Sequence, residues 1–230
     1  MLTIDAFTFN ARLQRMLSDY PKMMNDIMFN PLDTHDTPRF LRYAHDEKRR
    51  LALAVIFQMM FVGSPAVYYG DEVGISGDND PDCRKCMVWD RNQQDSFLLW
   101  LYKRLIAIRH REDCIRTGSF AACYCKGNCY GFVRYYSELS DEPVYTVINV
   151  SSEQMDILLP VLSAGSYVEV LAANEQGVSD SNCCYTAKEF TEVEWEAEHN
   201  DAFELNIIDY RAGIRLSVQP WEGLILQKKR

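Results

Sequence analysis

The chain has 230 residues, of which 47% are hydrophobic and 25% charged, and its formal net charge is −9 at pH 7. This composition is typical of a water-soluble globular protein with one or two domains. The acidic balance disfavours a nucleic-acid partner, since binding a phosphate backbone requires clustered Lys and Arg. It is compatible with a neutral ligand such as a sugar. No apolar run is long enough to predict a membrane span.

The N-terminal residues and the cysteines give an expectation about the compartment. Met1 to Asn10 lack the basic stretch and apolar run of a secretory signal. The eight cysteines form three close groups and one single residue: Cys83 with Cys86, Cys123 with Cys125 and Cys129, Cys183 with Cys184, and Cys114. No histidine stands at a metal-ligand spacing from them, so we expect reduced structural cysteines in a cytoplasmic protein. Disulfides or a zinc site are the remaining alternatives, and no cofactor is predicted.

From Met1 to Thr117, helical patterns alternate with short apolar runs. In chain order we expect a helix, a buried strand, a helix, a second buried strand, a polar loop and a third helix. These elements span Thr8–Tyr20, Ile27–Phe29 within the segment Asp26–Leu32, Asp46–Phe61 with Asp46 as N-cap, Pro65–Tyr69, Asp78–Asp90 and Gln94–Arg111. The alternation indicates parallel β/α units, although two strands cannot close a barrel or make a well-covered sheet.

From Gly118 to Arg230, strand-like runs alternate with turn signals. Two of these runs flank Lys126-Gly127-Asn128, which is a hairpin signature. The expected strands are Phe120–Cys125, Tyr130–Tyr135, Val144–Val150, Met155–Leu159, Tyr167–Leu171, Ala202–Ile208 and Leu224–Gln227. Strands at this spacing indicate a small antiparallel sandwich. The fold class is therefore α/β over residues 1–117 followed by an all-β domain over 118–230, with Trp100 and Trp221 in the core.

Three polar runs follow the predicted strands and carry the candidate chemistry. The run NPLDTHDTPRFL places His35 and Asp36 just past the first strand, and Tyr69-Gly70-Asp71-Glu72 ends the second. The loop DNDPDCRKCMVWD adds acidic groups, Arg84 and Trp89. In β/α architectures, residues past the C-terminal ends of strands face the active site. Charged groups bind hydroxyls and an indole stacks on a sugar face, so a sugar site is one interpretation and an ordinary surface loop the other.

Together these runs resemble the α-amylase family of glycoside hydrolases. In that family a His-Asp pair ends the seventh strand of a (β/α)8 barrel, and the eighth strand bears G-x-P-x-x-Y-Y-G-[DE]-E, here Gly63 to Glu72. The segments Asn79–Arg84 and Met87–Asp90 resemble the neopullulanase, maltogenic amylase and cyclomaltodextrinase group. The resemblance is strongest over residues 29–90. It implies the last two β/α units of a (β/α)8 (TIM) barrel followed by a C-terminal antiparallel β-sandwich.

The resemblance implies a role for four residues. Asp36 would be the family's third acidic residue, which stabilises the oxocarbenium-like transition state and helps to distort the sugar in subsite −1. His35 would bind hydroxyls of the same sugar. Asp80 and Arg84 would contact glucosyl units in the minus subsites. The predicted substrate is therefore an α-glucan or a maltooligosaccharide.

Other positions are expected to support the loops or depart from the family pattern. Tyr69 and Glu72 are expected mainly to fix their loop. Thr34 stands where the family often has Asn, and this change is expected to weaken local hydrogen bonding. Cys86 stands where Pro is common, which removes a rigid bend.

The resemblance also implies a retaining cleavage of α-1,4 and some α-1,6 bonds. Such a reaction needs a nucleophilic carboxylate and a separate acid/base about 5–5.5 Å apart. In the family these follow the fourth and fifth strands, and neither motif is found in this sequence. We therefore expect a glucan hydrolase as the parent protein and no activity from the 230-residue chain alone.

Two alternatives remain open: a non-catalytic structural or sugar-binding fragment, and an unrelated small α+β protein. Two barrel strands without their neighbours would also expose apolar faces. We therefore expect a homo-oligomer formed through these faces, or a rearrangement of residues 1–60.

Overall fold

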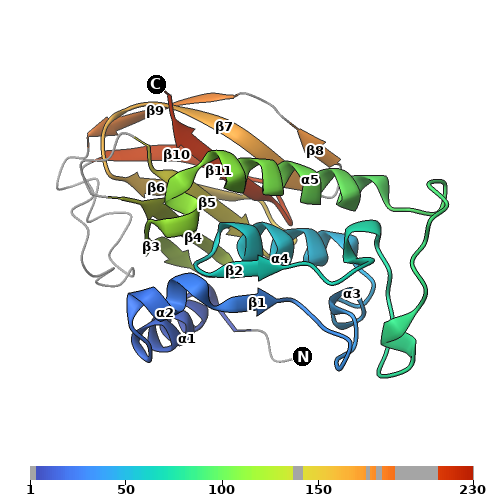
Figure 1. Ribbon diagram of the computed structural model, residues 1–230. Helices are drawn as coiled ribbons and strands as arrows, with labels where there is room; N and C mark the ends of the chain where they lie inside the picture. The colour runs from blue at the N-terminus through green and yellow to red at the C-terminus, as the bar shows by residue number, and fades with distance from the viewer. Residues whose placement is uncertain (1–3, 137–141, 175–176, 180–182, 190–211, 230) are drawn as a thin grey trace.

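The computed structural model describes residues 4–136, 142–174, 177–179, 183–189 and 212–229. A layer of helices with two short strands packs against a large antiparallel sheet (Figure 1). The first part contains α1 (Ala6–Ser18), α2 (Lys22–Ile27), β1 (Phe29–Pro31), α3 (Phe40–Tyr43), α4 (Lys48–Met60), β2 (Ser64–Ala66), α5 (Ser96–Arg111) and α6 (Asp113–Thr117). Two short 3₁₀ turns, Asp71–Val73 and Asp82–Arg84, lie in the long connection between β2 and α5.

The three long helices that the sequence predicts are all present. α5 begins after Asp95, whose Oδ1 accepts a hydrogen bond from the backbone N–H of Leu98 at 2.8 Å. The prediction that Asp46 caps α4 is wrong, because the helix begins two residues later at Lys48. Asp46 has a left-handed backbone with φ of 59°, and its carboxylate accepts from the hydroxyl of Ser76 instead.

β1 and β2 form a parallel pair, with Phe29 opposite Ser64 and Pro31 opposite Ala66. α3 and α4 lie in the connection between them, and α5 follows β2. The prediction of two buried strands is wrong, because residues of both strands are exposed or half-buried and Phe29 is 70% exposed. Ile27 also ends α2 instead of entering the strand. Within the described ranges the sheet has these two strands alone, so nothing covers its outer edges.

The second part is a continuous antiparallel sheet. Its strands are β3 (Ser119–Lys126), β4 (Cys129–Tyr135), β5 (Val144–Asn149), β6 (Met155–Val161), β7 (Gly165–Asn174), β8 (Gly177–Ser179), β9 (Cys184–Glu189), β10 (Ala212–Val218) and β11 (Gly223–Lys228). The order is β3-β4-β5-β11-β7-β9-β10-β6, with β8 added beside β7. The sequence predicts a sandwich of two sheets, whereas in the structure β9 pairs with both β7 and β10 and joins all strands into one sheet. Such non-local pairing leaves no local signal in the sequence.

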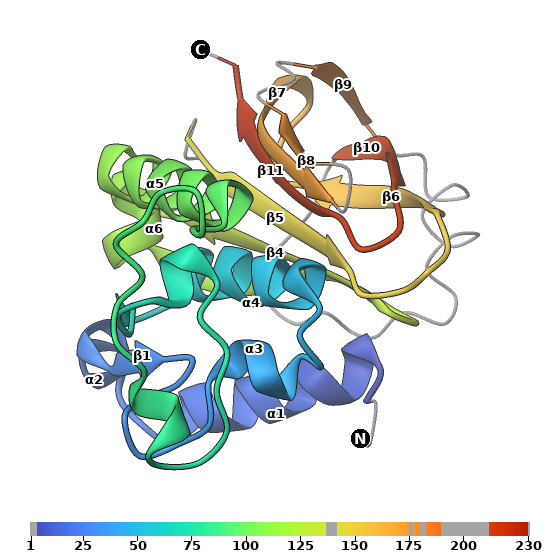
Figure 2. The same ribbon diagram turned by 90° about the vertical axis from the view of Figure 1, so that its right-hand side faces the viewer.

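The far strands of this sheet, β6 and β10, turn back over β4, β5 and β11 (Figure 2). A buried cluster fills the space between them, with Val133 and Tyr145 on one side and Leu159 and Ile214 on the other. The predicted hairpin is confirmed, since β3 and β4 pair from Ser119–Tyr135 to Lys126–Cys129 around the turn.

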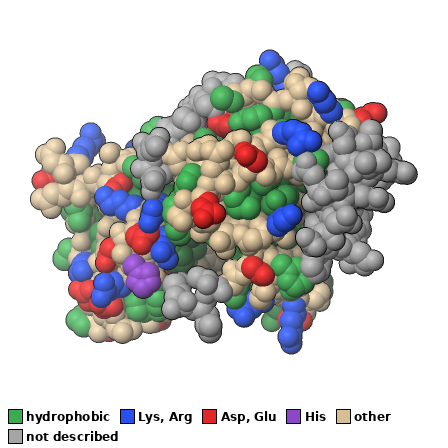
Figure 3. All heavy atoms as spheres, turned by 180° about the vertical axis from the view of Figure 1, so that it is seen from behind, with side chains coloured by type: hydrophobic (Ala, Val, Ile, Leu, Met, Phe, Trp, Pro, Cys, Tyr) green, Lys and Arg blue, Asp and Glu red, His purple; other side chains and the backbone are tan. Residues whose placement is uncertain are grey.

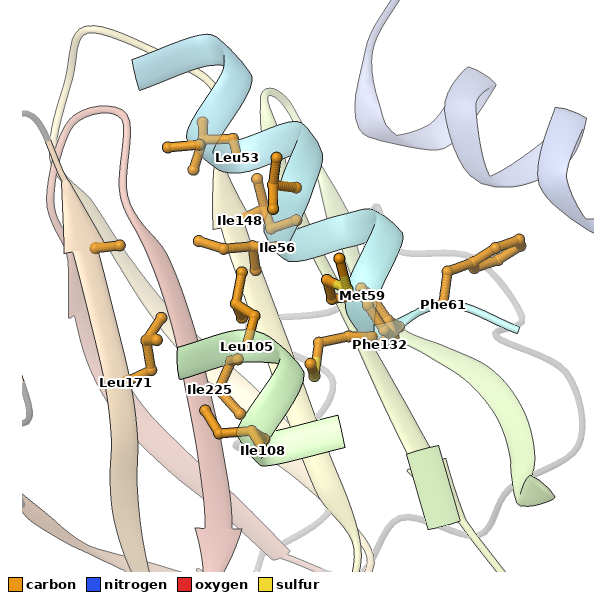
Figure 4. Close-up of a cluster of buried hydrophobic side chains, with 14 of the residues drawn as sticks. Leu53, Ile56, Met59, Phe61, Leu105, Ile108, Phe132, Ile148, Leu171 and Ile225 are labelled. Atoms are coloured by element: carbon orange, nitrogen blue, oxygen red, sulfur yellow. The ribbon is translucent and has the colours of Figure 1, made fainter. Parts of the chain in front are cut away.

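A second core joins the helices to the other face of the sheet (Figure 4). Leu53, Ile56 and Met59 from α4 and Leu105 from α5 point toward Ile225 and its neighbours on the sheet. Gly223 of β11 is required here, because a Cβ at this position would lie 2.5 Å from Ile56 Cδ1. The core therefore crosses residue 117, where the sequence suggests a domain boundary.

Two arginines bind the C-terminal end of α4 at this junction. Arg109 donates to the carbonyl oxygens of Met59 and Phe61 at 2.6 and 3.2 Å. The fully buried Arg134 of β4 donates to the carbonyls of Met60 and Gly118 at 3.2 and 2.9 Å. Burial lowers the pKa of each guanidinium to about 10, and the carbonyl oxygens offset the loss of water.

The remaining expectations can be compared with the described residues. Trp100 is wrongly predicted as core, because it lies on the solvent side of α5, while Trp221 is half-buried against the helix–sheet core. No disulfide joins any of the eight cysteines, all of which lie in the described ranges, and burial raises the pKa of Cys114 to about 11. None of the helices in the described ranges is long and apolar enough to cross a membrane. The predicted strand 202–208 lies outside the described residues.

Candidate functional site

The loops that follow β1 and β2 bring the four predicted site residues together. His35 and Asp36 follow β1, and their side chains contact each other with Nε2 and Oδ2 3.2 Å apart. Asp80 and Arg84 lie in the loop after β2, and Arg84 Nε is 3.0 Å from Asp80 Oδ1. Arg84 links the two loops, since its Nη2 is 3.5 Å from Asp36 Oδ1 and its Nε donates to the carbonyl of His35 at 3.2 Å.

This cluster is open to solvent. The side chain of Asp36 is 70% exposed and that of His35 is 59% exposed. Acidic and basic side chains lie close together at the end of the molecule that carries these loops (Figure 3). Exposed ion pairs of this kind contribute little to stability. Their close arrangement is therefore not explained by a large contribution to stability.

Thr34 fixes the turn that presents His35 and Asp36. Its Oγ1 accepts from the backbone N–H of Asp36 at 3.2 Å, and its own N–H donates to Thr37 Oγ1 at 3.0 Å. The sequence predicts that Thr34 weakens hydrogen bonding here. The structure differs, because a threonine hydroxyl forms the same local turn bonds that an Asn side chain provides.

A buried arginine lies beneath the exposed cluster. Arg39 is fully buried, and its Nη1 is 3.0 Å from Asp71 Oδ1. The same nitrogen donates to the carbonyl of Tyr69 at 2.7 Å, and Nε donates to the carbonyl of Cys83 at 2.8 Å. The guanidinium carbon lies 3.9 Å from the ring centre of Tyr68 and 4.7 Å from that of Tyr69.

Asp33 and Asp71 form a buried carboxyl pair beside Arg39. The pKa of Asp71 is raised to about 8, mainly by burial and also by the charge of Asp33, while Arg39 opposes the rise. Asp33 Oδ2 accepts from the N–H of Phe40 at 2.5 Å, while its buried Oδ1 has no donor among the described residues.

The sequence does not single out Arg39, Asp33 or Asp71 as site residues. A signal was present, because an arginine, two aspartates and a Tyr-Tyr pair fall within short loops that adjoin the two predicted strands. Tyr69 and Glu72 act as expected. The Tyr69 hydroxyl donates to the carbonyl of Lys85 at 2.7 Å, and Glu72 Oε2 accepts from the N–H of Gly70 at 2.7 Å.

Trp89 lies farther along the same loop. Its side chain is 81% exposed, so it is not a packing residue within this chain. It borders an open hollow of about 630 Å³ that is also lined by Arg91, Gln94 and Lys103. An exposed indole beside hydrogen-bonding side chains is suited to stacking on a sugar ring.

The chemistry of the cluster follows from its residue types. An accessible carboxylate beside an imidazole and a guanidinium can bind vicinal hydroxyls and stabilise a positive charge that develops on a sugar ring. Asp80 is already engaged by Arg84. Within the described ranges, no group of three or more His, Cys, Asp or Glu side chains is arranged to hold a metal ion.

Comparisons with a family model and with curated relatives point to the same protein family. The family described as "Alpha amylase, catalytic domain" matches residues 3–102. The chain is 42% identical over 156 residues to a cyclomaltodextrinase of Thermoanaerobacter pseudethanolicus, covering 68% of this chain and 27% of the relative. It is 37% identical over 176 residues to neopullulanase 2 of Thermoactinomyces vulgaris, covering 75% of this chain and 30% of the relative.

Solved structures agree with the sequence relatives. One that is named cyclomaltodextrinase superposes on 98% of this chain and 33% of its own length, with a TM-score of 0.76 and 28% identity. The chain thus spans less than a third of the length of the curated relatives reported above.

Proposed function

Because the chain belongs to the α-amylase family of glycoside hydrolases, with relatives among the cyclomaltodextrinases and neopullulanases, we propose that it is the C-terminal part of an α-glucan hydrolase. The whole protein would cleave α-1,4, and possibly α-1,6, bonds of maltooligosaccharides or related glucans by a retaining mechanism. Within it, residues 1–117 are the C-terminal portion of the catalytic barrel, with β1 and β2 as its last two strands. Residues 118–230 are the C-terminal β-domain.

Four residues are proposed to act on the sugar. Asp36 stabilises the positive charge that develops on the ring at the transition state, and His35 binds hydroxyls of the same ring. Asp80 and Arg84 bind the neighbouring glucosyl units. Arg84 orients both carboxylates, because it lies within 3.5 Å of each.

One observation carries the proposal. His35, Asp36, Asp80 and Arg84 come from two loops about 45 residues apart in the sequence, and they meet at the C-terminal ends of two parallel strands. This is the end at which active sites form in barrels of β/α units.

The nucleophile and the acid/base are proposed to lie in a part of the barrel outside these 230 residues. A retaining glycosidase needs two carboxyl groups about 5–5.5 Å apart on the two faces of the scissile bond. Near Asp36, the exposed carboxylate of Asp80 is paired with Arg84. The match to less than a third of each curated relative supports a longer whole protein.

The other candidate is a non-catalytic structural or sugar-binding protein of this length. One observation favours this second candidate. Met23, Ile27 and Phe29 are exposed apolar residues, and a second copy of the same chain would cover them. We propose a homo-oligomer through this face if the chain exists alone. In both cases we propose a cytoplasmic location, which described cysteines without disulfides support.

The test begins with the size of the native polypeptide in its source cells, measured by immunoblot against the β-domain. We expect a polypeptide about two to three times the mass of this chain, as a full barrel with flanking domains requires. That protein should hydrolyse maltotriose or a cyclodextrin. Asp36→Asn should lower kcat by about 10²–10³-fold, the usual cost of removing a group that stabilises transition-state charge.

The matched control is Asp19→Asn, which changes an exposed carboxylate at the end of α1 and should leave kcat unchanged. Equal activity of Asp36→Asn and wild type would remove Asp36 from the site. A native band at 26.7 kDa would instead support the non-catalytic candidate.

A further inference from the structure

Arg39 connects every segment that builds the site. Its backbone N–H donates to the carbonyl of Gly77 at 2.9 Å, where the loop of residues 78–90 begins. Its side chain donates to the carbonyls of Cys83 in the middle of that loop and of Tyr69 at the exit of β2. Asp71 in the 3₁₀ turn supplies the opposite charge. One buried residue therefore contacts the start of the loop that carries Asp80 and Arg84 through its backbone, and the middle of that loop through its side chain.

The contacts continue from Cys83 to the exposed cluster. Cys83 is fully buried, and its Sγ lies 3.3 Å from the carbonyl oxygen of His35. Arg84, the next residue, donates to that same carbonyl and contacts Asp36 and Asp80. The positions of Asp80 and Arg84 relative to His35 and Asp36 thus depend on where the Cys83 carbonyl is held.

Apolar packing cannot hold this loop, because most of its side chains are polar and exposed. A buried guanidinium can do so, since it is a planar fork with donors aimed in fixed directions. Its flat faces also pack against the rings of Tyr68 and Tyr69. A lysine in the same place would keep the charge near Asp71 but would lose the fork and the stacking.

We propose that Arg39 is a positioning residue that holds the loop of residues 78–90, so that Asp80 and Arg84 face His35 and Asp36. Its consequence for sugar binding rests on the function proposed above. The positioning of the loop itself does not, and it can be measured without any sugar.

Arg39→Lys is the test variant and Arg134→Lys is its matched control. Both arginines are fully buried and both donate to backbone carbonyls, but Arg134 lies at the junction of α4 with the antiparallel sheet. Both variants should lower the midpoint of thermal unfolding. Hydrogen exchange of the Asp82 and Arg84 amides, which donate within the loop, separates the two roles.

In Arg39→Lys these two amides should exchange about tenfold faster or more, whereas in Arg134→Lys they should exchange as in the wild type. Asp71→Asn, which removes the charge that pairs with Arg39, should give a smaller increase of the same kind. If Arg39→Lys does not fold, the proposal is tested by the loop exchange of Asp71→Asn. Unchanged loop exchange in the folded Arg39 and Asp71 variants would overturn the proposal and leave Arg39 a purely stabilising residue.

Maltotriose titration of the same proteins, followed by NMR, then tests the consequence. Binding by wild type and Arg134→Lys, with a dissociation constant raised about tenfold in Arg39→Lys, would support positioning for sugar binding. Equal affinities of wild type and Arg39→Lys would overturn that consequence. Absence of binding by the wild type would count against the sugar-binding role of the cluster, while the exchange rates still decide the positioning role.

Discussion

Helix α4 packs on two sheets in different ways. Toward the antiparallel sheet it presents Ile56 and its apolar neighbours, which are completely buried. Toward β1 and β2 it presents Gln58, whose Nε2 donates to the carbonyls of Asn30 and Ala66 at 2.9 Å each. The antiparallel sheet is held by apolar burial. The parallel pair is held by directed hydrogen bonds and leaves much of its apolar surface in water.

This difference shows which strands the rest of the described chain covers. Every described residue of β5 is buried, whereas none of β1 or β2 is. Parallel strands normally need cover on both faces and further strands beside them. The site therefore stands on the less buried of the two sheets, and a buried polar network around Arg39 lies beneath it.

The largest expected effect is a change in the free energy of unfolding when a core residue is shortened. Ile225→Ala removes a fully buried side chain between α5 and the sheet and should cost about 2–5 kcal/mol. Phe29→Ala in β1 removes a larger but exposed side chain and should change stability by about 0.5 kcal/mol or less. Urea unfolding measures both. Comparable losses at the two positions would show that β1 is packed in solution, which would contradict the difference in burial between the two sheets.

A second prediction concerns pH and the polar network. The pKa of Asp71 is raised by burial to about 8 from a reference value of 3.8, so the folded state holds this proton more tightly than the unfolded state. The stabilisation is fully present below about pH 3.8 and is lost as the pH rises through about 8. Asp71→Asn carries no titrating group at this position. Its unfolding midpoint should fall less than that of wild type between pH 6 and pH 9, measured by thermal unfolding in matched buffers.

The charged and titratable groups around Asp71 decide whether the pH dependence can be assigned to Asp71 itself. Asp33 and Arg39 act on the charge of Asp71, and Asp71 in turn acts on Tyr102, as Asp33 and Glu72 do. Burial raises the pKa of Tyr102 above its usual value, and the negative charge of Asp71 raises it further, so Tyr102 does not lose its proton in this range. Identical pH profiles for wild type and Asp71→Asn would contradict the raised pKa of Asp71.

These contacts explain what the sequence could and could not predict. The long helices follow from the 3.6-residue spacing of apolar positions. The site residues are proposed from the resemblance of their motifs to those of the family, and the polar pattern alone leaves an ordinary surface loop open. The burial of β1 was predicted wrongly, because Ile27-Met28-Phe29 is apolar whether or not a neighbouring strand covers it. The hydrogen-bond partners of the Arg39 side chain lie 30 or more positions away along the chain, and β9 pairs with strands on both of its sides. Local sequence patterns contain no signal for such distant contacts.

A smaller effect is expected at the start of α5. Asp95 caps this helix through Leu98 N–H and also pairs with Lys48 of α4. Asp95→Ala should lower the free energy of unfolding by about 1 kcal/mol, the usual cost of losing such a cap. Asp95→Asn retains a side-chain oxygen that can accept from Leu98 and serves as the control. Equal losses in the two variants, measured by urea unfolding, would assign the effect to the ion pair instead of the cap.

The smallest expected effect on stability is at the surface of the parallel pair. Self-association tests whether the exposed apolar residues there need cover. Phe29 lies near Met23 and Ile27 in the sequence, and all three are exposed apolar side chains on α2 and β1. Contiguous apolar surface of this kind drives association. We expect self-association of the 230-residue chain by light scattering and its reduction in Phe29→Ser. Val150→Ser, at an exposed valine just after β5, is the matched control and should associate as the wild type does. A monodisperse wild-type monomer would show that the parallel pair is stable without further cover, and the homo-oligomer proposal would then fail.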